Sequence, residues 1–453
     1  MKRSFCILFT ALFILMSAAP GLGMAVFGES GSFANETRAR VPSLSKADGS
    51  FNKAVLDETE DYFADRFAFR KELITAWAGL NAGLFGTSVE DKVVLGSEGW
   101  LYYAETLDDY RGVSMSGEEL EYAARNLALM QEYAESRGAQ FIFTCAPNKN
   151  SLYPENMPSG IPAGHGGSNA ALLGPLLVEH GVAYVDMFEL FGGREETLYY
   201  RTDSHWTNRG AALAADALLD AAGKDSAFFE GGFAEGGAHI GDLYEMLYPA
   251  GTAAETEESY APGFSYTLGG NPDGGNAQRI SASVPGAEGS LLCWRDSFGI
   301  ALYPYLADSF ASSLFLRRDV YDLTLIDDNE ADTVIVELVE RNLPRLASVA
   351  PVLEAPRRDE SADAETGSSA ECRTETKRGS SLQHCSGAVP QDADPLSRLY
   401  VVTDRGAYEA CVVVTDGQIC FSAYIDASES VEALIYYSNG AAVKCGVNLL
   451  QEE

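Results

Sequence analysis

Residues 116–145 read SGEELEYAARNLALMQEYAESRGAQFIFTC and join a capped helix to an apolar strand. Ser116 and Glu119 have the spacing of a capping box, and apolar residues then recur every three or four positions until Gly138. Residues 140–145 are largely apolar, as in a strand that is buried on both faces. A helix that leads directly into such a strand predicts a parallel sheet covered by helices.

The same alternation extends along the chain. We expect further strands at residues 182–185, 290–294, 312–316 and 333–338, and helices at residues 170–180, at 209–222 and from about Phe298. A short hairpin is expected at residues 93–103. Residues 224–289 are rich in glycine and break the rhythm, so we interpret them as an insertion. Residues 54–350 thus predict one α/β domain.

Both ends of the chain differ from this domain. Lys2 and Arg3 precede the uncharged residues 4–27, which indicate export from the cytoplasm, either as a cleaved signal peptide or as a retained membrane anchor. The protein is therefore expected to be secreted or membrane-anchored, with residues 28–53 as a polar tether. Residues 351–395 contain few aliphatic side chains and predict a disordered linker. Short β-like runs in residues 396–453 predict a small β-rich module.

Charge and cysteine usage limit the partners. The 66 acidic residues outnumber the 32 basic ones and give a formal net charge of −34, which opposes nucleic-acid binding and favours neutral or cationic partners at long range. Because salt screens surface charges over distances beyond about 10 Å, the net charge does not exclude a local basic groove. Cys372 with Cys385, or a pair among the three later cysteines, could form a disulfide after export. The spacing of Cys and His predicts neither a metal site nor a cofactor.

Two segments carry the reactive residue types, namely residues 203–210, DSHWTNRG, and residues 294–299, WRDSFG. Asp203 can hold one imidazole nitrogen of His205 and leave the other as a base. Ser297 lies at a strand-to-helix turn, which exposes a nucleophile and offers backbone N–H groups to an oxyanion. Taken alone, His205 could be a solvated loop residue and Ser297 a helix cap. Together the three predict a Ser-His-Asp triad, while His239 lies among glycines and gives no comparable signal.

These blocks resemble the SGNH (GDSL-like) hydrolases, in which an Asp-x-His pair precedes a glycine and an alanine-containing helix. Here the Asp/His block comes before the serine block, and this rotated order resembles the DHHW family and the periplasmic O-acetyltransferases of alginate biosynthesis. Further segments that resemble the group are residues 65–70, DRFAFR; 99–102, GWLY; 146–149, APNK; 153–154, YP; 295–298, RDSF; and 340–343, ERNL. The resemblance covers residues 61–343.

The resemblance implies a circularly permuted SGNH domain with a flavodoxin-like parallel sheet. It also implies an extracytoplasmic O-acyltransferase, for which we expect O-acetyl transfer to a cell-envelope or secreted glycan. A separate membrane-bound O-acyltransferase would deliver the acyl group. A carbohydrate acetylesterase with the same triad remains an alternative, as does a catalytically silent protein that binds glycan or assists envelope assembly.

Two departures from the family pattern bear on the site. Ser204 stands where the family has a second histidine, and no Gly-x-Asn-Asp block follows residues 333–338. Arg341 and Asn342 occupy that place, so either is a candidate oxyanion donor or part of a polar helix start. Asn148 and Lys149 follow the strand at residues 140–145, so they are candidates for substrate contact or for a solvated strand exit.

Overall fold

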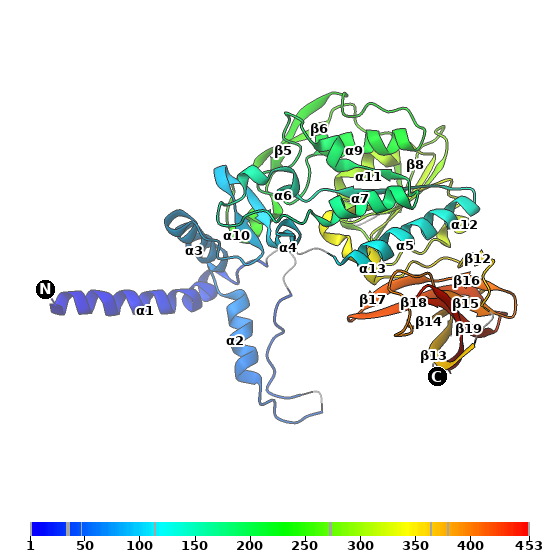
Figure 1. Cartoon of the computed structure of the whole chain (residues 1–453). Helices are drawn as coiled ribbons and strands as arrows, with labels where there is room; N and C mark the ends of the chain where they lie inside the picture. Colours follow the sequence, from blue (N-terminus) through cyan, green and yellow to red (C-terminus); the bar gives the residue numbers. More distant parts are fainter. Residues whose placement is uncertain are drawn as a thin grey trace.

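The computed structural model describes residues 2–32, 37–46, 48–112, 115–270, 274–362, 365–377 and 380–451. Figure 1 shows a helix that projects at the N-terminus, a layered α/β domain, and a curled sheet at the C-terminal end.

The central sheet has seven strands in the order β4-β3-β11-β9-β10-β8-β7. Five of them are parallel, namely β3 (Gln140–Ala146), β4 (Tyr184–Val185), β9 (Ser290–Trp294), β10 (Ser312–Leu316) and β11 (Thr333–Val339). The last two strands, β8 (Arg279–Ser283) and the edge strand β7 (Thr267–Gly269), are antiparallel to their neighbours. The α/β class is therefore confirmed, but the sheet is mixed. The segment that we interpreted as an insertion ends in strands of this sheet, because Ile280 and Ala282 alternate into its core.

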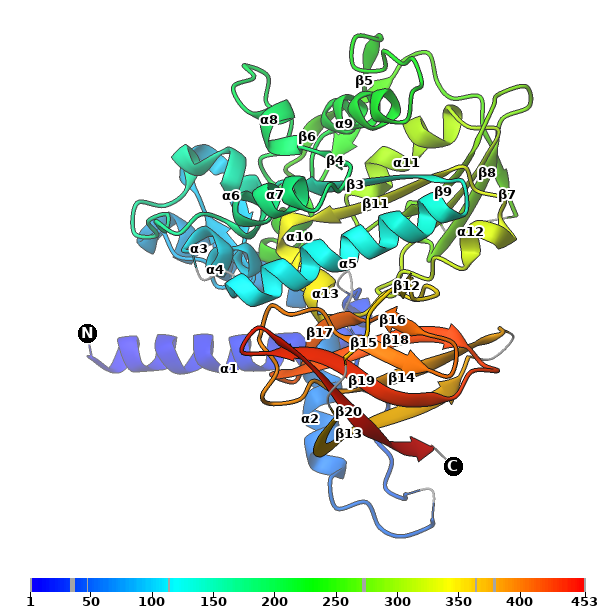
Figure 2. The same ribbon diagram turned by 45° about the vertical axis from the view of Figure 1, so that its right-hand side comes forward.

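Helices cover both faces of the central sheet (Figure 2). One face packs against α5 (Gly117–Ser136), α7 (Asn169–Glu179), α12 (Leu325–Asp328) and α13 (Pro344–Ser348). The other face packs against α9 (Asn208–Ala221) and α11 (Gly299–Asp308). The predicted capping box of α5 is present, since Ser116 accepts from Glu119 N–H and the Glu119 carboxylate accepts from Ser116 N–H. Shorter helices are α4 (Leu107–Tyr110), α6 (Lys149–Leu152) and α8 (Met187–Phe191).

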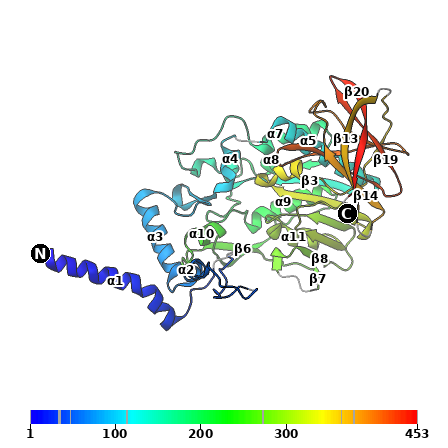
Figure 3. The ribbon, with the colours of Figure 1, turned by 90° about the horizontal axis from the view of Figure 1, so that it is seen from below.

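The N-terminal region begins with α1 (Lys2–Phe27), in which Ser4–Phe27 is long and apolar enough to cross a membrane. The helices α2 (Val55–Arg66) and α3 (Arg70–Phe85) and the hairpin β1 (Val93–Leu95) and β2 (Leu101–Tyr103) follow. The view in Figure 3 shows α1 extending away from the body of the protein, with α3 beside the end where α1 joins it. The predicted hairpin at residues 93–103 is confirmed.

The glycine-rich segment also carries a second hairpin over one end of the α/β domain. Its strands β5 (Phe233–His239) and β6 (Glu255–Tyr260) are antiparallel, and α10 (Asp242–Leu247) lies between them in the chain. Residue Asn208 at the start of α9 donates to the Glu258 carbonyl of β6 at 2.8 Å, which ties the hairpin to the domain.

A second, nine-stranded sheet forms the C-terminal part of the protein, in the order β12-β16-β15-β19-β20-β13-β14-β18-β17. The β-rich character of residues 396–453 is thus observed, but the sheet begins earlier in the chain. The strands are β12 (Arg357–Arg358), β13 (Glu365–Thr376), β14 (Leu382–Ala388), β15 (Tyr400–Thr403), β16 (Ala407–Glu409), β17 (Cys411–Thr415), β18 (Gln418–Asp426), β19 (Val431–Ser438) and β20 (Ala441–Gln451).

The expectation of a disordered linker at residues 351–395 is wrong for the described residues, because β12, β13 and β14 lie within it. β13 pairs in parallel with β20, and β14 pairs with both β13 and β18. Cys372, Leu382 and Cys385 are buried, whereas the polar residues around them lie largely at the surface. A strand of low aliphatic content is stable here because neighbouring strands supply the apolar surface and the main-chain partners.

The C-terminal sheet docks on α5 of the α/β domain. Asn126, which is 2% exposed, donates from its amide nitrogen to the carbonyl oxygens of Leu346 at 3.1 Å and Val412 at 3.0 Å. The Tyr122 hydroxyl donates to the Pro395 carbonyl at 2.5 Å. Buried polar bonds of this kind fix the two parts against each other.

Candidate active site

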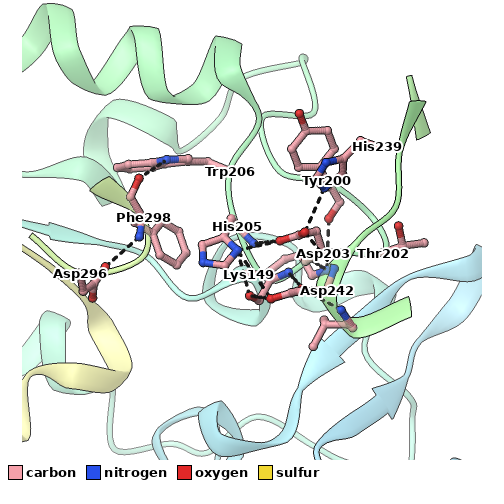
Figure 4. A network of polar contacts seen from close by, with 12 residues as sticks. Lys149, Tyr200, Thr202, Asp203, His205, Trp206, His239, Asp242, Asp296 and Phe298 are labelled. Atoms are coloured by element: carbon pink, nitrogen blue, oxygen red, sulfur yellow. Dashed lines mark hydrogen bonds and ion pairs between the residues drawn. The ribbon is translucent and has the colours of Figure 1, made fainter. Parts of the chain in front are cut away.

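Asp203 is the centre of a polar network at one end of the α/β domain (Figure 4). Its Oδ1 lies 2.7 Å from His205 Nδ1 and accepts the His205 N–H at 2.9 Å. Only 5% of Asp203 is exposed. Burial alone would raise the pKa of this carboxyl, but hydrogen bonds from His205 and His239 hold it well below its usual range. Asp203 is therefore ionised and fixes the orientation of the His205 ring.

Ser297 lines the same cavity as Asp203 and His205, at the bend between β9 and α11. The cavity has a volume of about 770 Å³. The ring of Phe298, the next residue, lies 4.9 Å from the His205 ring between centroids. His205 Nε2 is buried and has no hydrogen-bond partner among the described residues, Ser297 included. The three predicted triad residues thus share one cavity, in which only the Asp203–His205 pair is hydrogen-bonded.

His239 is a member of this network that the sequence did not single out. Its Nε2 lies 2.9 Å from Asp203 Oδ2, so the Asp203 carboxylate bridges two imidazole rings. The His239 ring stacks on Tyr200 with 4.0 Å between centroids. The hydrogen bond to Asp203 raises the pKa of His239. Glycines around His239 gave no local signal, because its partner lies on a different segment that only the fold brings close.

Asp242 is a second residue of this kind. Its N–H donates to Asp203 Oδ2 at 3.0 Å, and its own carboxylate accepts from the Ser204 N–H at 2.7 Å and the Ser204 hydroxyl at 2.6 Å. Burial, followed by the nearby Asp203 charge, raises the pKa of Asp242. Ser204 therefore ties the loop that contains Asp203 and His205 to α10.

Asp203, His205 and Asp242 also offer three ligand atoms within 4.8 Å of one another, a spacing that a metal ion could use. Nδ1 of His205 and the Asp203 carboxylate already bond each other at 2.7 Å, and Asp242 already accepts two hydrogen bonds from Ser204. A metal would have to break these bonds, so the arrangement fits a hydrogen-bonded network better than a ligand set.

Lys149 has a different place from the one we expected. It is 4% exposed and does not line the cavity, and its Nζ donates to the carbonyls of Tyr200, Arg201 and Asp203 at 3.1, 2.9 and 2.5 Å. Burial lowers the pKa of Lys149 to about 7, against the opposing charge of Asp203. Lys149 therefore holds the backbone of residues 200–203 from the interior of the protein and lies outside the cavity lining.

Asn148 is likewise buried, with 1% exposure, and lies outside the cavity lining. Its N–H donates to Glu340 Oε2 at 2.9 Å. The expectation of substrate contact is wrong for Asn148 and Lys149, because the strand exit after β3 is covered by the loops around it.

Asp296, which lines the cavity, joins the ends of β9 and β11. Its Oδ2 accepts from the Val339 N–H and from the Asn342 amide, both at 2.8 Å. Its Oδ1 accepts from the Phe298 N–H at 2.9 Å, so this backbone donor at the helix start is already engaged. Asn342 lines the cavity with its amide nitrogen fixed by one bond and a second N–H left over.

Arg341 also lines the cavity, with its guanidinium 5.4 Å from the Tyr103 ring centroid and 5.6 Å from that of Phe298. It is one of five arginines in the lining, together with Arg295, Arg317, Arg318 and Arg345. The Arg295 guanidinium donates to the carbonyls of Gly275, Ala277 and Asp296, and Arg345 forms an ion pair with Asp319. The lining also contains five carboxylates, from Glu105, Asp203, Asp242, Asp296 and Asp319, so the cavity holds charged side chains of both signs in equal number.

Comparisons with known proteins find matches to the part of the chain that contains Asp203 and His205. Residues 93–260 match the family model described as SGNH hydrolase-like domain, acetyltransferase AlgX, a segment that includes Asp203 and His205 and ends before Ser297. The chain is 30% identical over 224 residues to the probable alginate O-acetylase AlgJ of Pseudomonas syringae pv. tomato, which covers 48% of this chain and 52% of the relative. It is 26% identical to AlgJ of Pseudomonas aeruginosa, over 39% of this chain and 45% of that relative. The chain thus spans about half the length of these relatives.

Solved structures that resemble the chain include Bacillus cereus PatB1 with a sulfonyl adduct, at 18% identity and a TM-score of 0.44, covering 55% of this chain and 95% of that one. A DHHW family protein from Eubacterium siraeum has 19% identity and a TM-score of 0.43, with coverages of 58% and 99%. The O-acetyltransferase domain of Pseudomonas putida AlgJ has 18% identity and a TM-score of 0.38, with coverages of 56% and 92%. The resemblance to SGNH-like proteins of the AlgJ and AlgX group, which the sequence motifs indicate, is confirmed, with the family match lying at residues 93–260.

Proposed function

We propose that this protein is an extracytoplasmic O-acyltransferase that moves an acetyl group onto a hydroxyl of a cell-envelope or secreted glycan, with Ser297 as the nucleophile. One observation carries the proposal. Asp203 engages Nδ1 of His205 at 2.7 Å, which leaves Nε2 buried without a partner in a cavity that Ser297 also lines. An imidazole held in this way is ready to accept a hydroxyl proton.

The reaction would proceed through an acyl-serine. Ser297 Oγ attacks the acyl carbonyl while its proton passes to His205 Nε2, and the donor leaves with that proton as the carbonyl re-forms. A sugar hydroxyl then attacks the ester, gives its proton to His205, and leaves as the acetylated product while Ser297 regains its proton. Asp203 stabilises the imidazolium in both halves.

Asn342 is our candidate for the oxyanion donor. One N–H of its amide is held by Asp296 at 2.8 Å, which fixes the direction of the other. A donor that is oriented before the reaction stabilises developing charge at little reorganisation cost. Arg341, which shares the cavity, would supply positive charge for the oxyanion or for the acceptor.

The strand order supports a circularly permuted SGNH domain. If the five parallel strands are counted from β9 through β10 and β11 and then on to β3 and β4, their order across the sheet becomes 2-1-3-4-5. This is the flavodoxin-like order, and it places Ser297 directly after the first strand of the count. The Asp/His block then follows the fifth strand.

The names of the relatives support a polysaccharide acceptor, since both AlgJ relatives are named for alginate. We propose that the acetyl donor is a membrane-bound O-acyltransferase, which the candidate membrane span of α1 would bring near. Release of the acyl group to water would make the same site an esterase.

A fluorophosphonate probe tests the nucleophile, because it reacts only with an activated serine and loses fluoride as the phosphorus–oxygen bond forms. We expect one adduct per chain, on the peptide that contains Ser297. The rival is Ser204, whose hydroxyl lies 3.2 Å from His205 Nδ1 but is directed to Asp242. Peptide mapping by mass spectrometry separates the two, and an adduct on Ser204, or none, would overturn the proposal.

An acceptor competition assay tests the transfer reaction. With an activated acetyl ester and oligosaccharide present together, a transferase yields acetylated sugar, whereas an esterase yields only acetate. Ser309→Ala is the matched control for the loss of the Ser297 hydroxyl. Ser309 lies at the far end of α11, where its hydroxyl donates to the Tyr305 carbonyl at 3.0 Å. A protein that takes the probe at Ser297 but never acetylates sugar would be the esterase.

A further inference from the structure

Helix α3 shows an apolar face to solvent. Leu73, Trp77, Leu80, Leu84 and Phe85 are between 49% and 69% exposed. The first four follow the spacing i, i+4, i+7 and i+11, so they form one continuous stripe along the helix. The sequence from Leu73 to the end of α3 contains no charged residue.

The opposite face of α3 is the one that attaches to the α/β domain, and it is the less apolar of the two. Ala78 is fully buried and belongs to a small cluster with Leu101, Leu243 and Leu247. The Thr75 hydroxyl accepts the Ala250 N–H at 2.9 Å. A surface helix normally buries its larger apolar side chains, and α3 has the reverse arrangement. An exposed apolar stripe of this kind indicates contact with an apolar environment.

The position of α3 indicates which environment that is. Its N-terminal flank packs against the end of α1, where the rings of Phe27 and Phe69 lie 5.5 Å apart in an edge-on contact. Gly23 of α1 approaches Ala68 and Phe69 so closely that a Cβ there would lie 2.8 Å from both side chains. The start of α3 is therefore fixed where the apolar segment Ser4–Phe27 ends (Figure 3).

We propose that, in the chain that retains α1, the outward face of α3 is a membrane-docking surface that inserts into the lipid headgroup region of the bilayer that α1 would cross. The residues at the first turn, Arg70 and Lys71, would lie among headgroups, and the stripe from Leu73 to Phe85 would contact acyl chains. Trp77 at the middle of the stripe has the amphipathic ring that suits this boundary. The inference does not depend on Ser297 or on acyl transfer.

The tryptophans of the chain make the test specific. Of the four, Trp77 is 58% exposed, whereas Trp100, Trp206 and Trp294 are 6%, 1% and 1% exposed. The full chain, with α1 retained, is reconstituted in phosphatidylcholine vesicles that carry bromine on the acyl chains, since bromine quenches an indole only at contact. We expect the loss of most Trp77 emission, with bromine near the headgroup quenching more than bromine near the chain end.

Trp77→Phe is the matched control, because it keeps the apolar stripe and removes only the reporter. The remaining emission of this variant should be the same in brominated and plain vesicles. Unquenched Trp77 in the reconstituted wild type would overturn the proposal, because the face would then lie outside the bilayer. Equal quenching of wild type and Trp77→Phe would overturn it as well, because the signal would come from the buried indoles.

Discussion

Removing the Ser297 hydroxyl should abolish turnover of a chromogenic acetyl ester without unfolding the protein. We expect Ser297→Ala and His205→Ala each to lower kcat on the order of 10⁴-fold, since the loss of either triad member leaves only binding and oxyanion contacts. Asp203→Asn should lower kcat by a similar factor, because it would hold the His205 imidazole in the wrong tautomer. Rates are compared with Ser309→Ala, and circular dichroism checks the fold. Retained turnover in Ser297→Ala would mean that another residue is the nucleophile.

The stability that His239 supplies should depend on pH. The hydrogen bond to Asp203 raises the pKa of His239 in the folded protein. The contribution is therefore complete below the unfolded value of about 6.5 and disappears as pH rises through the folded pKa. We expect the difference in Tm between wild type and His239→Gln to be largest near pH 5.5 and to shrink as pH rises above the unfolded value of about 6.5. A difference that grows with pH would contradict this assignment.

At the scale of single residues, local sequence was informative only where the partners are close in the chain. Asp203 and His205 are two positions apart, and their spacing alone predicts the bond that the structure contains. His239 reaches the same carboxylate from β5, and only the antiparallel hairpin brings it there. Lys149 was misplaced because sequence gives no measure of how deeply a strand exit is covered.

Among the elements, Glu340 directly after β11 and Asp109 of α4 form a buried acid pair whose titration is predictable. Burial, followed by the charge of Asp109, raises the pKa of Glu340 to about 8. The folded protein therefore holds a proton that the unfolded chain releases near pH 4.3, and stability falls as pH rises from there to about 8. Glu340→Gln should flatten the dependence of Tm on pH over this window. The exposed Glu118→Gln serves as control, and an unchanged slope in Glu340→Gln would refute the assignment.

Most helices and strands of the α/β domain could be predicted because their apolar patterns are strong, with a helical periodicity in α5 and a continuous apolar run in β11. β13 and β14 could not, because their stability lies in pairing with β20 and β18, strands that are far away in the chain. Composition measures what a segment can bury by itself. It does not measure what a neighbouring strand supplies.

For the whole molecule, Asn126 is a buried residue at the contact between the two parts. Asn126→Asp would replace the donor of both hydrogen bonds with a carboxylate facing the carbonyls of Leu346 and Val412. We expect a loss of about 3 kcal/mol or more in the free energy of unfolding, because a buried charge without a partner is costly. Denaturant unfolding measures it, and separate transitions for the α/β domain and the C-terminal sheet should appear. A variant as stable as wild type would show that the contact contributes little.

The hairpin of β5 and β6 has a consequence for how such proteins diversify. It presents Asp242 and His239 to Asp203, and its Glu255 accepts the backbone N–H groups of Arg201 and Thr202 at 2.9 and 2.8 Å. A segment that lines the cavity is thereby also bonded to the Asp203–His205 pair. If the proposed function is correct, grafting this hairpin from a homologue would change the support of that pair together with the cavity wall, so we expect the two to vary as one unit.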